Sequence, residues 1–217
     1  MNSNIKYNSA TPKIGEGIYF TPDVAEILKL PYHRVQYLMK GFWQAKTFGS
    51  ERNKAINFFG LIEFNIYYYL RNKGLTSSQI KKLHNKLSKD FETDYPFASL
   101  KIKTHENQVW LDFKGFLMKA DGKLQPSFRQ FIEPFLEKIE YGDDFLAKRF
   151  FPLKNSKHIV IDPKKQFGKP IISKSGVRTD VIYKFHLGGE TNDNICNLYE
   201  LQPEQVKDAI KYHQPAA

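Results

Sequence analysis

Apolar residues recur at helical spacing twice between residues 17 and 41. Thr21 begins the first predicted helix, because it precedes a proline and an aspartate as an N-cap residue does. Pro31 separates this helix from a second one that ends at Gly41. Two short helices joined by a tight turn are typical of a helix-turn-helix. The apolar residues of the second helix fall at positions i, i+3 and i+4: Val35, Leu38 and Met39.

Further patterned segments follow this motif. The polar, glycine-containing stretch 46–54 has the length of a wing, the hairpin that flanks such motifs in winged-helix proteins. A longer helix is predicted over 58–72, and the capping box at 76–79 starts another. Apolar and polar residues alternate over 100–113, which predicts a β-hairpin with one apolar face.

The chain changes character again after residue 128. A helix kinked or split at Pro134 is followed by glycine, proline and paired aspartates, which indicate a linker. The last sixty residues combine two short strands with three short helices in a helix-turn-helix-like unit. The predicted fold class is therefore α+β and mostly α. Its parts are a flexible leader at 1–16, a winged helix with hairpin and helix at 17–140, the linker at 141–157 and a small helical domain at 158–217.

Composition places the chain among ordinary globular proteins. Its 217 residues are 41% hydrophobic and 26% charged, and the 15% aromatic content predicts a core rich in Phe and Tyr. A single cysteine, Cys196, excludes a disulfide framework. Residues 1–13 lack the apolar core of a signal peptide, and the most apolar run, 56–70, is too short and interrupted to cross a bilayer. We therefore expect a cytoplasmic protein with no membrane partner.

The net charge of +10 is concentrated in the first half of the chain. The first 120 residues hold 18 Lys and Arg against 10 Asp and Glu. A positive surface attracts polyanions such as duplex DNA before any base is read. A charge that serves solubility alone is the alternative, and the bias toward the N-terminal half favours nucleic acid.

The polar side of the second helix carries the most specific candidates for DNA recognition. In a helix-turn-helix, residues near the start of the second helix reach base edges in the major groove, and arginine can donate two hydrogen bonds to guanine. A solvated helix face is the simpler alternative. The candidate residues on this face are Tyr32, His33, Arg34, Gln36, Tyr37 and Lys40.

Three more residues are candidates for contact with the DNA backbone. Arg52 and Lys54 lie in the predicted wing, where an ordinary charged loop is the alternative. Thr21 lies at a helix N-terminus, which attracts phosphate, although the same position suits a plain N-cap.

The sequence lacks the residue patterns of an enzyme or a metal site. Its six histidines are scattered, and none forms an HxxxH pair or clusters with carboxylates at metal spacing. Asp143-Asp144 falls in the linker, and Glu133 with Glu137 lies on a solvated helix face. Neither pair therefore supports a two-carboxylate nuclease. We expect no catalytic residue, no cofactor and no metal.

The predicted helix at 58–72 is apolar on nearly every side. A helix of this kind must be buried on more than one side, against the C-terminal domain or against another chain. The sequence does not decide between these two; a homodimer is a separate expectation for this protein. The aromatic residues concerned are Phe58, Phe59, Tyr67, Tyr68 and Tyr69.

Two segments resemble known families. Residues 17–89 resemble the MerR-type winged helix through GIYFTPDVAEILKLPYHRVQYLMKGFW and INFFGLIEFNIYYYLRNKGLTSSQIKKL. Residues 158–213 resemble a small helical domain of unknown function, number four-thirty-three, through IVIDP, FGKPII, VRTDVIYKF and LYELQPEQVKDAI. Joined by DYPFAS and FIEPFLEKIEY, the two segments make the chain similar to the longer VapB-type antitoxins. It departs from the domain's usual Gly-Thr-Arg at 173–178, and it lacks the long dimerisation helix of MerR regulators.

The resemblance implies an antitoxin that binds and neutralises a PIN-like ribonuclease toxin and represses its own operon by binding operator DNA. The alternative is a stand-alone winged-helix transcription regulator whose C-terminal domain senses a ligand or dimerises. Residues 158–217 carry 8 basic and 7 acidic residues, so they gain little from phosphate attraction. We expect this domain to contact protein, while the first half contacts DNA.

Overall fold

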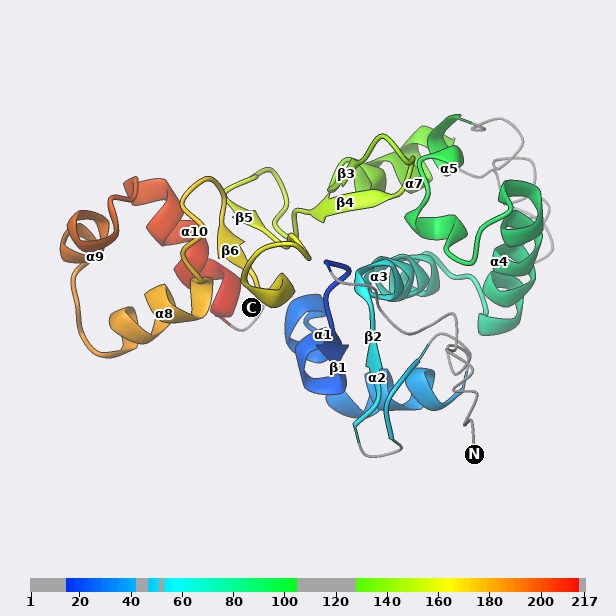
Figure 1. Cartoon of the computed structure of the whole chain (residues 1–217), viewed down its shortest axis with the longest axis horizontal. Helices are drawn as coiled ribbons and strands as arrows, with labels where there is room; N and C mark the ends of the chain where they lie inside the picture. The colour runs from blue at the N-terminus through cyan, green and yellow to red at the C-terminus, as the bar shows by residue number, and fades with distance from the viewer. Residues whose placement is uncertain (1–14, 42–46, 51–52, 105–127, 215–217) are drawn as a thin grey trace, which may run out of the picture. The chain divides into compact units, whose positions relative to one another are not determined.

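The structure, a computed structural model, describes residues 15–41, 47–50, 53–104 and 128–214, and the chain forms two compact units (Figure 1). Unit 1 is Met1–Lys148 and unit 2 is Arg149–Ala217. Helices predominate, and the strands of the described residues form small two-stranded sheets. The mostly helical α+β fold class expected from the sequence is confirmed.

Unit 1 opens with β1 (Tyr19–Phe20), α1 (Thr21–Leu28) and α2 (Tyr32–Lys40). Helix α1 ends because Lys29 adopts the left-handed conformation (φ 54°), which lets the Leu30 N–H donate to the carbonyl of Ala25 at 2.9 Å. The next residue, Pro31, is the N-cap of α2, and its carbonyl accepts from the backbone N–H of Arg34 at 3.0 Å. The two predicted helices and the turn between them are confirmed.

The start of α1 differs from the prediction in one respect. Its N-cap residue is Phe20, not Thr21, and Thr21 is the first residue of the helix. The Phe20 N–H donates to Oδ2 of Asp23 at 3.0 Å, so the first-turn aspartate satisfies the N-terminal backbone.

A short β-ladder follows the two helices. Strand β2 (Ala55–Ile56) pairs antiparallel with β1, and Ala55 also exchanges two 3.0 Å backbone hydrogen bonds with Phe48 on its other side. Gly49 makes the adjoining turn with φ +88°, where an added Cβ would lie 2.3 Å from the carbonyl oxygen of Asn53. Phe48 and Ala55, near the two ends of the stretch predicted as a wing, therefore lie side by side as an antiparallel pair.

Helix α3 (Phe58–Asn72) is the centre of the unit 1 core. It is buried on several sides, as predicted, and Phe58, Leu61 and Phe64 are fully inaccessible. We expected the C-terminal domain or another chain to cover it, whereas the elements packed against it belong to unit 1. Helix α4 (Ser77–Phe91) starts at the predicted capping box, in which the Gln79 N–H donates to Thr76 Oγ1 at 3.2 Å. The 3-10 helix η2 (Pro96–Ala98) packs against both α3 and α4.

The prediction of a strand at residues 100–104 is wrong, because Lys101–Thr104 forms the helix α5. Ser99 starts this turn, since its Oγ accepts from the Lys101 N–H at 3.2 Å and its carbonyl accepts from the Ile102 N–H at 3.2 Å. An alternation of only three residues, Leu100, Ile102 and Thr104, fits one helical turn as well as a strand. The rest of the expected hairpin lies outside the described residues.

Regular structure also occurs in the range 141–157, which we expected to be a linker. Helix α7 (Phe128–Leu136) contains Pro134, and it is followed by β3 (Ile139–Tyr141) and β4 (Ala147–Phe150), which pair with each other. The first two residues of β4 belong to unit 1 and the last two to unit 2.

Unit 2 joins a strand pair to three helices. Strands β5 (Ile159–Val160) and β6 (Ile171–Ile172) are antiparallel, with Ile159 opposite Ile172, and the 3-10 helix η3 (Gln166–Gly168) lies between them. Helix α10 (Pro203–His213) packs against α8 (Thr179–Leu187), α9 (Asn192–Tyr199) and β5. Its predicted apolar stripe is confirmed as core: Val206, Ala209 and Ile210.

Candidate nucleic-acid interface

The outer face of α2 is a continuous exposed surface of polar, basic and aromatic side chains. Tyr32 is 50% exposed and Tyr37 is 76% exposed. Gln36, by contrast, is half-buried at the edge of this surface. The structure brings together on one helix face all six residues that the sequence placed there. The remaining three, all exposed, are His33, Arg34 and Lys40.

The opposite face of α2 fixes the helix in unit 1. Val35 and Met39 are fully buried, and Leu38 is 4% exposed. Met39 Sδ accepts a hydrogen bond from the Thr21 hydroxyl at 3.2 Å, which ties α2 to the first turn of α1. The Thr21 side chain is therefore buried in the helix pair and cannot reach a phosphate, so the expectation of phosphate contact by its hydroxyl is corrected.

Arg34 lies close enough to helix α3 to affect a tyrosine there. Burial raises the pKa of Tyr68, the neighbouring Tyr67 adds to that rise, and the positive charge of Arg34 opposes it. The Arg34 side chain itself is exposed near the start of α2.

The predicted wing contributes less to the described surface. Lys54 is half-buried and directly precedes Ala55, the residue that pairs with both Phe48 and Phe20. Arg52 lies outside the described residues.

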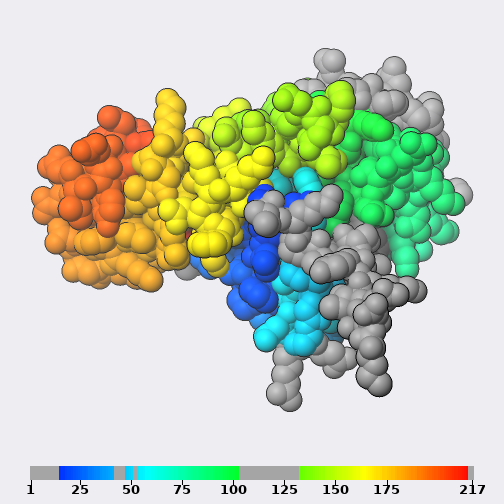
Figure 2. Space-filling model, in the orientation of Figure 1, coloured from blue at the N-terminus to red at the C-terminus, as the bar shows by residue number. Residues whose placement is uncertain are grey.

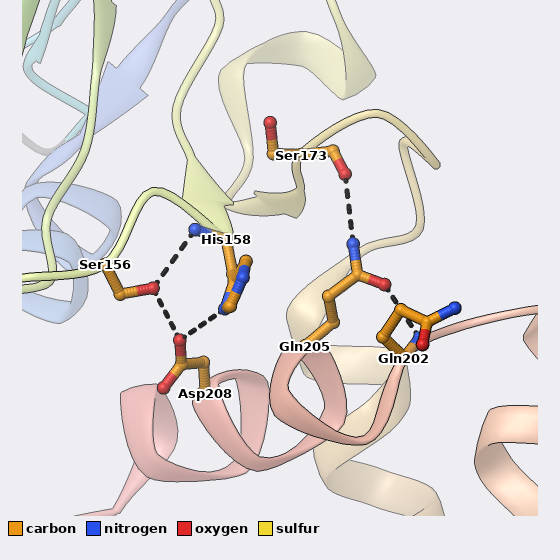
Figure 3. A network of polar contacts seen from close by, with 6 residues as sticks. All are labelled: Ser156, His158, Ser173, Gln202, Gln205 and Asp208. Carbon is orange, nitrogen blue, oxygen red and sulfur yellow. Dashed lines mark hydrogen bonds and ion pairs between the residues drawn. The ribbon is translucent and has the colours of Figure 1, made fainter.

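A second polar cluster lies within unit 2 and joins the segment before β5 to helix α10 (Figure 3). Asp208 Oδ2 accepts from the Ser156 hydroxyl at 2.5 Å and lies 2.8 Å from His158 Nδ1. Ser156 Oγ in turn accepts from the His158 N–H at 3.1 Å. A neighbouring contact joins Gln205 Nε2 to the Ser173 carbonyl at 3.5 Å.

Serine, histidine and aspartate occur together here, but not in the arrangement of a catalytic triad. A triad places the imidazole between the serine hydroxyl and the carboxylate. In unit 2 the carboxylate of Asp208 lies between the other two side chains, so the Ser156 hydroxyl donates to the carboxylate and not to the imidazole of His158. The cluster instead fixes the chain before β5 to α10.

A family model matches the C-terminal part of the chain. Residues 159–213 match the family model of a protein of unknown function, DUF433. This segment is a DUF433 domain. It covers β5 through α10, and the polar cluster of Ser156, His158 and Asp208 closes one side of it.

The resemblance of the chain to VapB-type antitoxins is also confirmed. The chain is 29% identical over 98 residues to a Mycobacterium tuberculosis protein named "Putative antitoxin VapB45". That match covers 45% of this chain and 40% of the relative, so the aligned part spans well under half of the relative's length.

A solved structure shares the fold. The crystal structure of Rv2018 from Mycobacterium tuberculosis matches with a TM-score of 0.74 and covers 88% of this chain and 96% of that chain. Its sequence identity is 21%, so the likeness concerns the fold alone.

Two absences bear on function within the described part of the chain. No group of three or more His, Cys, Asp or Glu residues there could hold a metal ion. None of the helices described is long and apolar enough to cross a membrane.

Sequence reasoning missed two sets of polar contacts. One is the contact of Glu63 and His84 in the core of unit 1, and the other is the cluster that joins Asp208 of the DUF433 domain to Ser156 and His158 just before it. The partners in each set lie on different elements, so no local spacing signals them. One indication of the first contact was visible in the sequence: Glu63 is a charged residue inside an apolar helical run, and a buried charge requires a partner.

Proposed function

We propose that this protein is an antitoxin that binds and neutralises a PIN-like ribonuclease toxin and represses its own operon by binding operator DNA as a homodimer. The observation that carries the proposal is the similarity to a relative named as an antitoxin. We assign toxin binding to the segment that matches DUF433 and DNA binding to the exposed face of α2.

The DNA surface is the outer face of α2, with α1 and the Phe48–Ala55 ladder as its winged-helix frame. Arg34 and Lys40 supply the cationic groups, and Tyr32 and Tyr37 supply hydroxyl donors on exposed rings. Arginine contacts with guanine give sequence preference, while lysine contacts with phosphate give affinity that falls with salt. This part of the proposal is tested by titrating operator DNA with the full chain.

The toxin surface lies on the DUF433 domain, around α9. Residues 185–206 contain four acidic residues and no Lys or Arg, although the whole chain carries +10. Leu187 and Leu198 are 67% and 62% exposed in the same segment, which Figure 2 shows in orange as an open surface. A ribonuclease must attract RNA and therefore presents a positive surface. An acidic face with exposed leucines is complementary to such a surface in charge and offers apolar area to bury.

Co-purification with the protein encoded beside this gene tests toxin binding. The tagged full chain is expected to retain that protein, and the Leu187→Ser/Leu198→Ser variant is expected to lose it. Ile18→Ser is the matched control, since Ile18 is 48% exposed in unit 1. Equal retention by all three chains would place the toxin surface elsewhere.

The same experiment separates the antitoxin from a stand-alone regulator. An antitoxin retains the neighbouring protein, whose addition should change the affinity of the chain for operator DNA. A chain that binds operator DNA and retains no neighbouring protein acts as a regulator alone.

A further inference from the structure

The connection between β5 and β6 displays an aromatic side chain at its tip. Phe167 is 90% exposed, the highest value among the large hydrophobic residues described. It lies in η3, and three lysines flank it within three positions. They are Lys164, Lys165 and Lys169.

The backbone holds Phe167 outward in a conformation that L-residues rarely adopt. Gln166 and Phe167 are consecutive and both have positive φ, of 46° and 55°. Residues held in this conformation are strained, and they persist only where their surroundings determine it. Backbone hydrogen bonds determine it here, because the Gly168 N–H donates to the Lys165 carbonyl at 2.8 Å and the Lys169 N–H donates to the Gln166 carbonyl at 3.0 Å.

The base of this loop is anchored by a buried carboxylate. Asp162 is 5% exposed, and its Oδ1 accepts from the Lys164 N–H at 2.9 Å. Its Oδ2 accepts from Arg149 Nε at 3.1 Å, and its carbonyl accepts from the Lys165 N–H at 3.0 Å. The exposure of Phe167 is therefore a property of an ordered turn. Such strain is characteristic of functional sites and ligand clamps.

The charge of the DUF433 domain is divided between its two ends. Residues 163–178 contain five Lys and Arg and no acidic residue, while residues 185–206 contain four acidic residues and no Lys or Arg. Figure 1 shows the β5–β6 pair on one side of α10 and α9 on the other. The net charge of this domain is therefore close to zero although it contains a basic loop and an acidic helix.

Not every cation of the basic loop is equally available. Arg178 makes two hydrogen bonds with the Asp180 carboxylate, at 2.7 and 2.9 Å, so its charge is compensated. Lys164 and Lys165 are consecutive exposed residues in the turn that leads to Phe167. An exposed aromatic ring beside exposed lysines can contact the apolar groove wall and the phosphates of a nucleic acid at the same time.

We propose that loop 163–169 is a second DNA-binding element, in which Lys164 and Lys165 contact phosphates and Phe167 packs into the groove. This inference rests on the proposed function, since its ligand is the same DNA duplex that the α2 face is proposed to contact. The DUF433 domain then has two opposed surfaces, a basic loop for DNA and the α9 face for protein.

The salt dependence of DNA binding measures the lysine contacts directly. Fluorescence anisotropy of an operator duplex is followed with the full chain and with Lys164→Gln/Lys165→Gln at several salt concentrations. Each phosphate contact contributes about 0.9 to the slope of log K against log salt, so the slope should fall by about 1.8. Lys207→Gln/Lys211→Gln is the matched control, since both lysines are exposed on α10 of the same domain. Phe167→Ala should lower affinity by about tenfold and leave the slope unchanged.

Photocrosslinking tests the position of the ring without relying on affinity. The full chain carrying Phe167→p-benzoylphenylalanine should crosslink to labelled operator DNA, and the chain carrying Leu198→p-benzoylphenylalanine should not. Crosslinks from position 167 to protein alone would overturn the inference.

Arg34→Ala in the same assay separates this inference from the proposed function. A loss confined to Arg34→Ala, with Lys164→Gln/Lys165→Gln equal to its control, overturns the loop contact and retains the α2 surface. A loss confined to the loop variants retains the inference and overturns the α2 surface. A full chain without affinity for duplex DNA overturns both DNA contacts, while toxin binding is judged separately by co-purification.

Discussion

His84 Nε2 lies 2.9 Å from Oε2 of Glu63, and the Glu63 side chain has no exposed surface. The other carboxylate oxygen accepts from the Phe97 N–H at 2.8 Å. The His84 ring also packs edge-on against the Phe97 ring, with centroids 5.2 Å apart. One buried carboxylate thus connects α3, α4 and η2 in the core of unit 1.

His84→Phe should destabilise the protein by about 3 kcal/mol, because the buried carboxylate loses its imidazole partner. The double variant Glu63→Gln/His84→Phe should be more stable than His84→Phe alone. A glutamine at this position removes the buried charge and can still accept from the Phe97 N–H. Urea unfolding midpoints measure both effects.

Lys86→Ala is the control on the same helix. It removes an exposed i,i+4 ion pair with Asp90, whose atoms are 2.7 Å apart, and should change stability by less than about 0.5 kcal/mol. Equal destabilisation by His84→Phe and Lys86→Ala would refute a structural role for the buried pair.

Arg34→Ala should weaken binding to operator DNA by about 1–3 kcal/mol, and binding to unrelated duplexes by less. The reason is that Arg34 is exposed at the start of α2, where an arginine reads base edges. Lys54→Ala should instead weaken binding to all duplexes alike. Anisotropy titrations compare the affinities of these variants for operator and unrelated duplexes. Lys81→Ala, at an exposed position of α4, is the control for the loss of one positive charge. Identical losses for Arg34→Ala and Lys81→Ala would mean that α2 contributes charge alone.

The stability of the protein should fall as pH rises from 10 to 12. Burial raises the pKa of Tyr95 to about 12, the charges of Glu16, Asp94 and Glu63 add to the rise, and the hydrogen bond from Asn57 opposes it. In the unfolded chain a tyrosine ionises near pH 10. The unfolded state therefore releases the proton first, and its population grows between these two values.

Tyr95→Phe should reduce the slope of unfolding free energy against pH in this range. Chemical unfolding at pH 9, 10, 11 and 12 measures the slope, which does not depend on the stability lost with the Asn57–Tyr95 hydrogen bond. An unchanged slope in Tyr95→Phe would assign the alkaline transition to other tyrosines.

Asp208→Ala should destabilise unit 2 by about 1–2 kcal/mol, because Ser156 and His158 both lose their carboxylate acceptor. Hydrogen exchange should become faster at residues 156–160, which the cluster holds against α10. Lys207→Ala, on the exposed side of the same helix, should leave exchange at these residues unchanged. Protection retained in Asp208→Ala would show that the strand pair alone fixes this segment.

The helices of this protein could be predicted because their signals are local. Val35, Leu38 and Met39 follow the helical repeat, and the Thr76–Gln79 capping box identifies the start of α4 without any tertiary information. The exposed residues of α2 followed from the same repeat. The segment at 100–104 failed because three alternating residues do not distinguish a strand from one helical turn.

Contacts between distant residues could not be predicted in the same way. The Glu63–His84 pair, the Thr21–Met39 hydrogen bond and the Asp208 cluster each join different elements. Helix spacing places a residue on a face but does not identify what packs against that face. The exposure of Phe167 likewise depends on two residues in the left-handed conformation, Gln166 and Phe167. Neither is a glycine, so the sequence does not indicate this conformation.

The most direct test of the antitoxin proposal is the ribonuclease activity of the protein encoded beside this gene, measured as the rate of RNA cleavage while the full chain is titrated in. We predict that the rate falls to background at a stoichiometric amount of this protein, and that Leu187→Ser/Leu198→Ser requires a large excess for the same effect. An undiminished cleavage rate at tenfold excess of the folded, wild-type chain would show that this protein is not an antitoxin of that ribonuclease.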